Sequence, residues 1–213
     1  MKKKKDVYYF IAHIDDFEIS CLSHLEKFCN EYNKINIFIA CKWHKKEKIW
    51  SKNLELIQNF FNIRINYHNF LFNQRTLMSN VDDLKDKFYK MIDFKNNFDL
   101  VSHDKEDNHT DHFACNLIAR GMFKYSSRFI TIYSPSSTNF KPNCWITLSD
   151  SLYNLKKTCV DKYNIDNEQS YSKLGYYLQS EEHYNLGRAF YLENFTCKNN
   201  KHYEIYNFQK QVY

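Results

Sequence analysis

Short apolar segments alternate along this chain with amphipathic ones. The apolar segments are rich in Val, Ile, Phe and Tyr and have the length of buried strands. Between them, apolar residues recur every three or four positions, which predicts helices with one buried face. The predicted strands are residues 7–12, 35–41, 63–67, 98–102 and 128–133, and the predicted helices are residues 19–31, 50–61, 81–92 and 114–122. This alternation favours an α/β, Rossmann-like three-layer fold with a mostly parallel central sheet.

The C-terminal third of the chain has a weaker pattern. Residues 145–148 fit another short strand, and helical segments are expected around and after it. No internal repeat or linker divides the sequence, so we expect one domain over residues 1–213. Residues 1–6 are rich in lysine and are predicted to form a flexible basic tail, because the apolar stretch that follows is too short for a signal peptide.

Composition narrows the class of protein. Aromatic residues make up 18% of the chain, which is ample material for a packed core. The formal net charge of +5 is small and the acids are interspersed, so no nucleic-acid partner is expected. The seven cysteines include no CxxC pair, which favours reduced thiols and a cytoplasmic protein. No stretch approaches the roughly 18 apolar residues of a transmembrane segment. Contact of the lysine tail with an anionic membrane surface stays open.

Polar residues follow two of the predicted strands at once. His13, Asp15 and Asp16 come after the first strand, and His109 and His112 come after the fourth. In a doubly wound sheet the carboxyl ends of neighbouring strands face one crevice. His13, Asp16 and His112 would then supply two imidazoles and a carboxylate, a ligand set for Zn²⁺ with a position left for water. Either cluster alone is better explained by helix capping or surface exposure; both at matching positions favour a metal site.

Four segments, in this order, resemble motifs of the LmbE-like (PIG-L) zinc-dependent de-N-acetylase family, of the N-acetylglucosaminyl deacetylase type. Residues 12–18 (AHIDDFE) resemble the A-H-P-D-D-x-E signature, and residues 109–112 (HTDH) resemble H-x-D-H. Residues 135–143 (PSSTNFKPN) are similar to P-S-S-x-N-F-x-P-N, and residues 191–195 (YLENF) are similar to Y-A-E-x-F. Together the four matches extend over nearly the whole chain.

The resemblance implies a role for each matched residue. His13, Asp16 and His112 match the metal ligands of the family. Asp15 matches the carboxylate that activates the metal-bound water. His109 matches the histidine that assists the tetrahedral intermediate or the leaving amine. These residue types suit the chemistry, because a metal activates water while a nearby carboxylate accepts its proton.

Other positions carry weaker or divergent signals. Asp111 could orient a histidine from behind or only cap the helix that follows, and Glu193 is a candidate for the substrate pocket. Ile14 stands where the family has proline, which removes a rigid turn residue but no functional group. Residues 50–52 (WSK) stand where many members place an arginine near the substrate. The reaction is therefore better defined by the resemblance than the substrate is.

The resemblance thus implies a Zn²⁺-dependent hydrolase of a linear amide bond, although another divalent metal would also fit. Its substrate would be a small N-acetylated amino sugar, in the form of a glycoside, a nucleotide sugar or a lipid-linked sugar. Two alternatives stay open. One is hydrolysis of another amide or a carbamoyl group on a natural product, and the other is a non-catalytic sugar-binding protein with the same fold. A homo-oligomer is compatible with the sequence.

Overall fold

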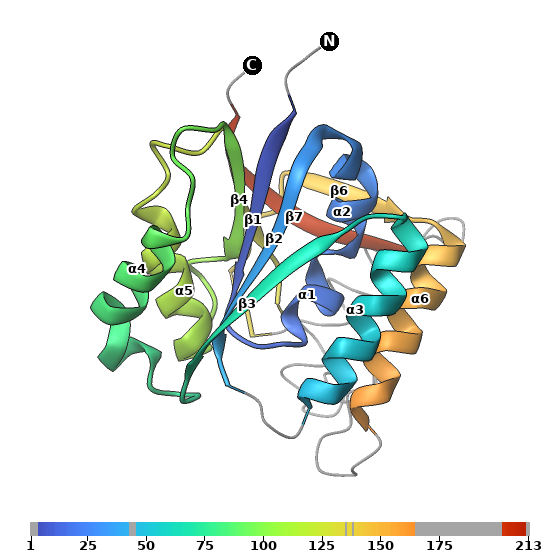
Figure 1. The fold of residues 1–213 in the computed structure, drawn as a ribbon, viewed down its shortest axis with the longest axis horizontal. Coiled ribbons are helices and arrows are strands. Elements are labelled where there is room, and N and C mark those ends of the chain that lie inside the picture. Colours follow the sequence, from blue (N-terminus) through green and yellow to red (C-terminus); the bar gives the residue numbers. More distant parts are fainter. Residues whose placement is uncertain (1–3, 43–45, 135, 138, 165–201, 212–213) are drawn as a thin grey trace.

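A twisted seven-stranded sheet, with strand order β3-β2-β1-β4-β5-β7-β6, forms the centre of the molecule (Figure 1). The computed structural model describes residues 4–42, 46–134, 136–137, 139–164 and 202–211. The strands are β1 (Lys5–Ile11), β2 (Tyr32–Cys41), β3 (Ile65–Phe72), β4 (Phe98–His103), β5 (Arg128–Ile132), β6 (Cys144–Leu148) and β7 (His202–Gln211). The first five strands are parallel, and β7 runs antiparallel to both β5 and β6.

Helices cover both faces of the sheet, so the predicted three-layer α/β fold is confirmed. The helices are α1 (Asp16–Ser20), α2 (Leu22–Phe28), α3 (Glu47–Phe61), α4 (Val81–Lys90), α5 (Thr110–Arg120) and α6 (Asp150–Asp161), with short 3₁₀ turns η1 (Cys29–Glu31), η2 (Leu77–Asn80) and η3 (Lys162–Asn164). Figure 1 shows α4 and α5 on one side of the sheet and α1, α2, α3 and α6 on the other.

The central strand β1 explains why its sequence is uninterruptedly apolar. Val7, Tyr9 and Ile11 pack into the core beneath α1, α2, α3 and α6. Tyr8 and Phe10 point the other way, into the core beneath α4 and α5. Because both faces of a central parallel strand are buried, no position is left for the polar residues of a half-exposed strand.

The strand order places the two polar clusters at one edge of the sheet. β1 pairs with β2 on one side and with β4 on the other, in parallel and with Phe10 opposite Ser102. The chain thus reverses its direction of winding at β1 and β4. A crevice outside the carboxyl ends of the strands opens at such a switch point. The segments after β1 and β4 therefore meet there, as the sequence pattern predicts.

Some boundaries differ from those expected from the sequence. The predicted helix over residues 19–31 is divided at Cys21, where φ is −124°, and the Ser20 hydroxyl ties the end of α1 to the carbonyl of Tyr133. Strand β1 begins at Lys5, so the last two residues of the predicted basic tail belong to the sheet.

In the part of the chain that the structure describes, no helix has both the length and the apolar character needed to cross a bilayer.

Strand β7 is the largest difference from the expected pattern, which placed helical segments in the C-terminal region. Helix α6 agrees with that expectation, but residues 202–211 form a strand between β5 and β6. The strand is mostly polar in sequence, and among residues 204–209, whose burial the structure describes, Glu204, Ile205 and Tyr206 are buried. Glu204 is held there by hydrogen bonds from Ser23 and Lys156. Because a charged residue occupies a buried position, the hydrophobic pattern does not predict this strand.

A buried ion pair stabilises the amino-terminal edge of the sheet, away from the strand ends that form the crevice. Arg128 at the start of β5 donates two hydrogen bonds, of 2.8 and 2.6 Å, to Asp99 on β4. Lys5 on β1 lies 3.0 Å from the other oxygen of Asp99. Asp99 is fully buried, and its two cationic partners therefore join three adjacent strands.

Replacement of Arg128 by alanine is expected to lower the free energy of unfolding by about 3 kcal/mol, because Asp99 would stay buried with only Lys5 to balance its charge. Denaturant titration followed by circular dichroism would measure the change. Arg64→Ala is the matched control, since Arg64 is exposed and its loss should cost less than about 0.5 kcal/mol. Equal stabilities of the two variants would contradict a structural role for the Arg128–Asp99 pair.

Candidate metal centre

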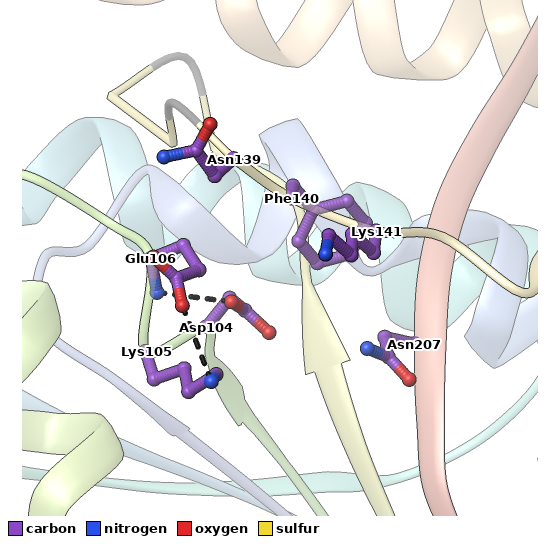
Figure 2. A pocket seen from close by; sticks show the side chains of 7 residues that line it. All are labelled: Asp104, Lys105, Glu106, Asn139, Phe140, Lys141 and Asn207. Carbon is purple, nitrogen blue, oxygen red and sulfur yellow. Dashed lines mark hydrogen bonds and ion pairs between the residues drawn. The ribbon is translucent and has the colours of Figure 1, made fainter.

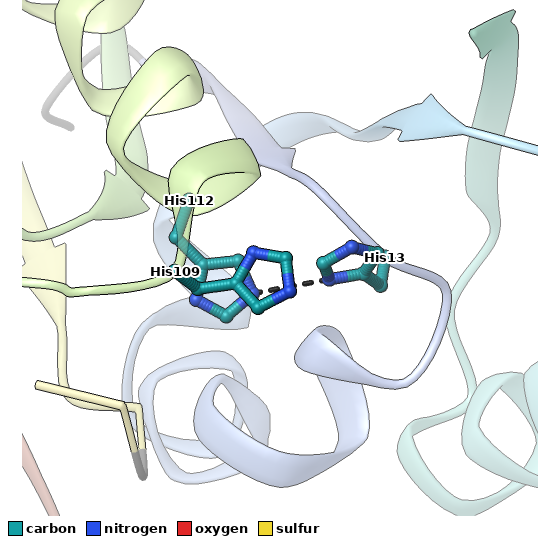
Figure 3. A group of neighbouring side chains, drawn as sticks. All are labelled: His13, His109 and His112. Atoms are coloured by element: carbon teal, nitrogen blue, oxygen red, sulfur yellow. Dashed lines mark hydrogen bonds between the residues drawn. The ribbon is translucent and has the colours of Figure 1, made fainter. Parts of the chain in front are cut away.

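Three histidines from two distant segments converge at the crevice (Figure 3). His13 lies in the turn that follows β1, His109 is the N-cap of α5, and His112 lies in the first turn of α5. Asp16 is the first residue of α1 and contacts both His13 and His112. The fold therefore brings together residues that are 99 positions apart in the sequence.

The facing atoms of His13, Asp16 and His112 lie close together in a triangle of side chains, in which Asp16 faces each imidazole with a different carboxylate oxygen. His13 Nδ1 lies 3.1 Å from His112 Nε2, His112 Nε2 lies 3.4 Å from Asp16 Oδ1, and Asp16 Oδ2 lies 3.5 Å from His13 Nδ1. In a tetrahedral zinc site with bonds of about 2.0–2.1 Å, neighbouring ligand atoms are about 3.3–3.4 Å apart. The three side chains thus offer suitable donor atoms at distances from one another close to those in a zinc site.

Each of the two imidazoles has its second nitrogen on a carboxylate. His112 Nδ1 lies 2.9 Å from Asp107 Oδ2, and His13 Nε2 lies 3.3 Å from Asp111 Oδ2. Such contacts fix the orientation of a ligating histidine and increase the basicity of the nitrogen that faces the metal. The remaining nitrogens, His13 Nδ1 and His112 Nε2, therefore both face the Asp16 carboxylate.

The electrostatics of the group favour a cation. Burial alone would lower the pKa of His112, but Asp16 and Asp107 outweigh it and raise that pKa to about 9. Burial would also lower the pKa of His13. The hydrogen bonds with Asp111 and Asp16 outweigh that effect, so the pKa of His13 lies well above its usual value. The same carboxylates that stabilise a proton on these imidazoles would stabilise a metal ion in its place.

Asp111 is committed to holding loops together. Its carboxylate accepts hydrogen bonds from the backbone N–H groups of Arg75 at 2.6 Å and Leu77 at 3.4 Å, in addition to contacting His13. The capping role that the sequence left open for Asp111 belongs to His109, whose Nδ1 accepts the Asp111 N–H at 3.2 Å. Asp111 therefore connects the segment before α4 with the imidazole of His13.

His109 stands over the other two rings as a neutral imidazole. Its ring centroid lies 4.7 Å from that of His13 and 4.6 Å from that of His112. Burial and then the charges of His112 and His13 lower the pKa of His109 to about 4. Because Nδ1 accepts the hydrogen bond of the helix cap, the proton of the neutral ring lies on Nε2. His109 thus offers an N–H donor next to the triangle of ligand atoms.

Asp15 is the N-cap residue of α1 and is only 4% exposed. Neither Asp15 nor Asp16 forms the side-chain capping bond that the sequence pattern allows for, since Asp16 instead accepts the N–H of His13 at 2.6 Å. Burial raises the pKa of Glu18 well above its usual value, and the nearby charge of Asp15 adds to that rise. The Asp15 carboxylate therefore lies beside Asp16 on the same short helix, in a buried acidic environment.

Asp107, Ser134 and Ser136 take part in the site, although Asp107 and Ser134 lie outside the sequence motifs and the motif that contains Ser136 gave it no role. Asp107 accepts hydrogen bonds from the hydroxyls of Ser134 and Ser136, the latter at 2.5 Å, while it contacts His112. Burial would raise the pKa of Asp107, but His112 and Ser134 hold it far below its ordinary value. Ser134 and Ser136 thus help to keep the partner of His112 ionised and in place.

His103, at the end of β4, belongs to none of the sequence motifs but contacts the site. It stacks on His112 with ring centroids 3.8 Å apart, and it lies 3.3 Å from Asp16. Its Nε2 accepts the backbone N–H of Ala12 at 3.0 Å, so that lone pair is not available to a metal. His103 therefore supports the ring of His112. The candidate pocket residue Glu193 and the motif of residues 191–195 lie outside the described residues.

Replacement of Asp107 by asparagine is expected to weaken metal binding by about 10- to 100-fold, because the orientation and basicity of His112 would be reduced without loss of a ligand. Competition with a chromophoric chelator would measure the metal dissociation constant. Asp86→Asn, at an exposed position of α4, is the matched control. Unchanged affinity in Asp107→Asn would show that His112 does not bind the metal through Nε2.

Comparison with known proteins supports the fold and leaves the reaction open. No family model and no curated protein matches this sequence. Among solved structures, the N,N'-diacetylchitobiose deacetylase from Pyrococcus horikoshii is similar with a TM-score of 0.64 and 13% identity, over 98% of this chain and 85% of that one. A deacetylase of the teicoplanin biosynthesis pathway is similar with a TM-score of 0.59 and 10% identity, over 94% and 96% of the two chains.

A protein of another class has the same fold. GalB, the 4-carboxy-2-hydroxymuconate hydratase from Pseudomonas putida KT2440, is similar with a TM-score of 0.58 and 11% identity, over 98% of each chain. The fold implied by the sequence motifs is therefore confirmed over nearly the whole chain. Identities this low establish the architecture, and the chemistry has to be argued from the residues of the site.

Proposed function

We propose that this chain is a metal-dependent hydrolase that removes the acetyl group from an N-acetylated amino sugar and releases acetate and a free amine. The observation that carries the proposal is the triangle of His13, Asp16 and His112, with ligand atoms 3.1–3.5 Å apart. The deacetylases with the same fold and the ordered motifs in the sequence support this reaction over others.

The metal would be held by His13, Asp16 and His112. Bound there, Zn²⁺ would lower the pKa of a water molecule and polarise the amide carbonyl. A set of two imidazoles and one carboxylate also suits other divalent transition metals, so the identity of the ion remains part of the proposal. The carboxylates of Asp107 and Asp111 would keep the two imidazoles oriented throughout the reaction.

Asp15 is the proposed general base. Its carboxylate would accept a proton from the attacking water and later deliver a proton to the departing nitrogen. Its place beside Asp16 on α1 supports this role, because a ligand and a base on adjacent residues share one rigid helix start.

His109 is proposed to stabilise the charge that develops on the carbonyl oxygen. Its neutral ring carries a hydrogen on Nε2, and a preorganised N–H donor is the group that such an oxygen requires. The fixed position of the ring follows from its second role as the N-cap of α5. His109 would therefore act as a hydrogen-bond donor rather than as a metal ligand.

The six cysteines that the structure describes are free thiols. Unpaired cysteines in this number support a reducing compartment, and we propose that the protein acts in the cytoplasm on a small-molecule sugar. A lipid-linked sugar would require contact with a membrane surface in addition.

Acetate release from a panel of N-acetylhexosamine conjugates tests the proposed reaction. We expect acetate and a product lighter by one acetyl group, with activity lost on chelation and restored by Zn²⁺ or another divalent ion. The panel should include other amides, N-carbamoyl compounds and an unsaturated acid that a hydratase would accept. Turnover of one of these compounds without acetate release from any sugar would overturn the proposal.

A further inference from the structure

Exposed apolar side chains gather at the amino-terminal edge of the sheet, where the parallel strands begin. The candidate metal centre and the cavity that starts at Asp104 (Figure 2) lie at the opposite, carboxyl end of β4. Met91 and Phe94 lie between α4 and β4, and Phe123 and Tyr125 lie between α5 and β5. Figure 1 shows both segments at the end of the molecule where β1 begins. These four side chains, here called the apolar patch, are each at least 39% exposed.

Contacts between the two segments show that the apolar patch is one surface. The rings of Phe94 and Tyr125 meet edge to face with centroids 5.3 Å apart. Phe94 also packs edge to face against the buried Phe98 at 6.3 Å, and Phe123 packs against Phe129 at 5.7 Å. The inner sides of the rings are therefore anchored in the core while their outer sides face solvent. Large apolar side chains grouped in this way mark a surface that binds a partner.

The residues around the apolar patch are mostly cationic. Its two segments, residues 90–97 and 120–127, contain one acidic residue, Asp93. The Asp93 carboxylate accepts hydrogen bonds from the N–H of Lys95 at 3.0 Å and from the Asn96 side chain at 2.9 Å. The same segments contain four exposed basic residues: Lys90, Lys95, Arg120 and Lys124. The rim of the apolar patch therefore carries a net positive charge.

The start of the chain adds positive charge at the same place. The N–H of Asp6 donates to the carbonyl of Asn97 at 3.0 Å, so β1 begins beside the segment that carries Phe94. Residues 2–5 are all lysine. Lys4 is exposed and lies two residues before Asp6, a chain length of at most about 7 Å. Lys4 therefore extends the basic rim.

The combination of aromatic rings and lysines selects among possible partners. A second copy of the chain would bring the basic rims together across a two-fold axis, and the repulsion of like charges opposes that contact. Nucleic acid is recognised mainly through arginine, whose planar group matches phosphate, whereas lysine is a compact charge on a flexible apolar stem. Such a stem can lie along an apolar boundary while its ammonium group stays in water. These properties favour the surface of an anionic membrane.

We propose that the amino-terminal edge of the sheet binds reversibly to the surface of an anionic membrane. Phe94 and Tyr125 enter the boundary between headgroups and acyl chains, where aromatic side chains are stabilised. Lys95 and Lys124 lie at the level of the negatively charged headgroups. The proposal goes beyond the proposed reaction and does not depend on it. Because β1 has seven residues and spans roughly 20 Å, the crevice at its far end faces the water.

Cosedimentation with vesicles of phosphatidylcholine, with and without phosphatidylglycerol, tests the charge of the surface. We expect binding to the anionic vesicles and its loss at about 1 M NaCl, where the Debye length is only about 3 Å. Lys95→Ala and Lys124→Ala should each weaken binding about fivefold. Lys48→Ala and Lys52→Ala, at exposed positions of α3, remove the same charge elsewhere and are the matched controls. Equal losses in the two pairs, or equal binding to both kinds of vesicle, would overturn the proposal.

A second pair of variants tests the apolar patch. Phe94→Ser should weaken binding to the anionic vesicles at least about fivefold, because a half-exposed ring no longer leaves water. Trp145→Ser, which removes a ring that is 51% exposed on β6, should have no effect. Both variants should unfold at the wild-type temperature and keep the wild-type metal content. Vesicle binding that Phe94→Ser leaves unchanged would overturn the proposal. So would binding to an oligonucleotide but not to vesicles, or a dimer in sedimentation that Phe94→Ser dissociates.

Discussion

Replacement of His112 by alanine is expected to abolish stoichiometric metal binding and to reduce acetate release by at least about a thousandfold. His112 is 6% exposed and supplies one corner of the ligand triangle, while Asp16 supplies another at 3.4 Å. Loss of a ligand removes the charge that activates water and polarises the amide, an effect of several kcal/mol on the barrier. Metal analysis of the purified protein and an acetate assay at saturating substrate would measure both effects.

Three further variants make this result specific. His68→Ala removes an exposed histidine of β3 and should leave metal content and activity unchanged. His109→Ala should retain the metal but lose activity, whereas Asp16→Ala should lose the metal. His13, His109 and His112 also lie close enough together to form a ligand set of their own. Loss of metal in His109→Ala together with its retention in Asp16→Ala would favour that set and contradict the role of Asp16.

Replacement of Asp15 by asparagine is expected to lower kcat by about 10²- to 10⁴-fold while the bound metal stays at one equivalent. Asparagine has the shape of aspartate but cannot accept the proton of water. Because Asp16 rather than Asp15 contacts both imidazoles, the ligand triangle should be unaffected. Single-turnover kinetics with the metal-loaded protein would isolate the chemical step.

The controls for Asp15→Asn use the same chain. Asp86→Asn should leave kcat unchanged, since Asp86 is exposed on α4. Thermal unfolding should show that the Asp15 variant remains folded. A variant with wild-type kcat, or one that loses its metal, would contradict the assignment of Asp15 as the general base and would make it a ligand or a structural residue instead.

The parts of the fold that the sequence predicted are those in which local pattern and burial agree. β1 reads as a strand because both of its faces are covered, and its neighbours in the parallel sheet share that property. β7 could not be identified in this way. Its burial depends on pairing with β5 and β6. Its buried Glu204 is tolerated only because Lys156 and Ser23, which are distant in sequence, form hydrogen bonds with it.

In the candidate site, too, some residues could be predicted from local sequence and others could not. Residue type and position after a strand were enough to nominate His13, Asp16 and His112, because parallel strands end at one edge of the sheet. The supporting contacts were not predictable, since Asp107 acquires its role only when the segment around Ser136 folds back over it. Local sequence reports which chemistry a residue can perform, and tertiary structure decides which partner it meets.

The most direct test of the account is a metal titration of the chelated protein with acetate release as the readout. The account predicts no acetate release without metal, a linear rise as Zn²⁺ or another divalent ion is added, and a plateau at one equivalent per chain. The His112→Ala protein should stay inactive throughout the same titration. Full acetate release from metal-free protein, or a titration that His112→Ala leaves unchanged, would contradict the central claim that His13, Asp16 and His112 hold the catalytic metal.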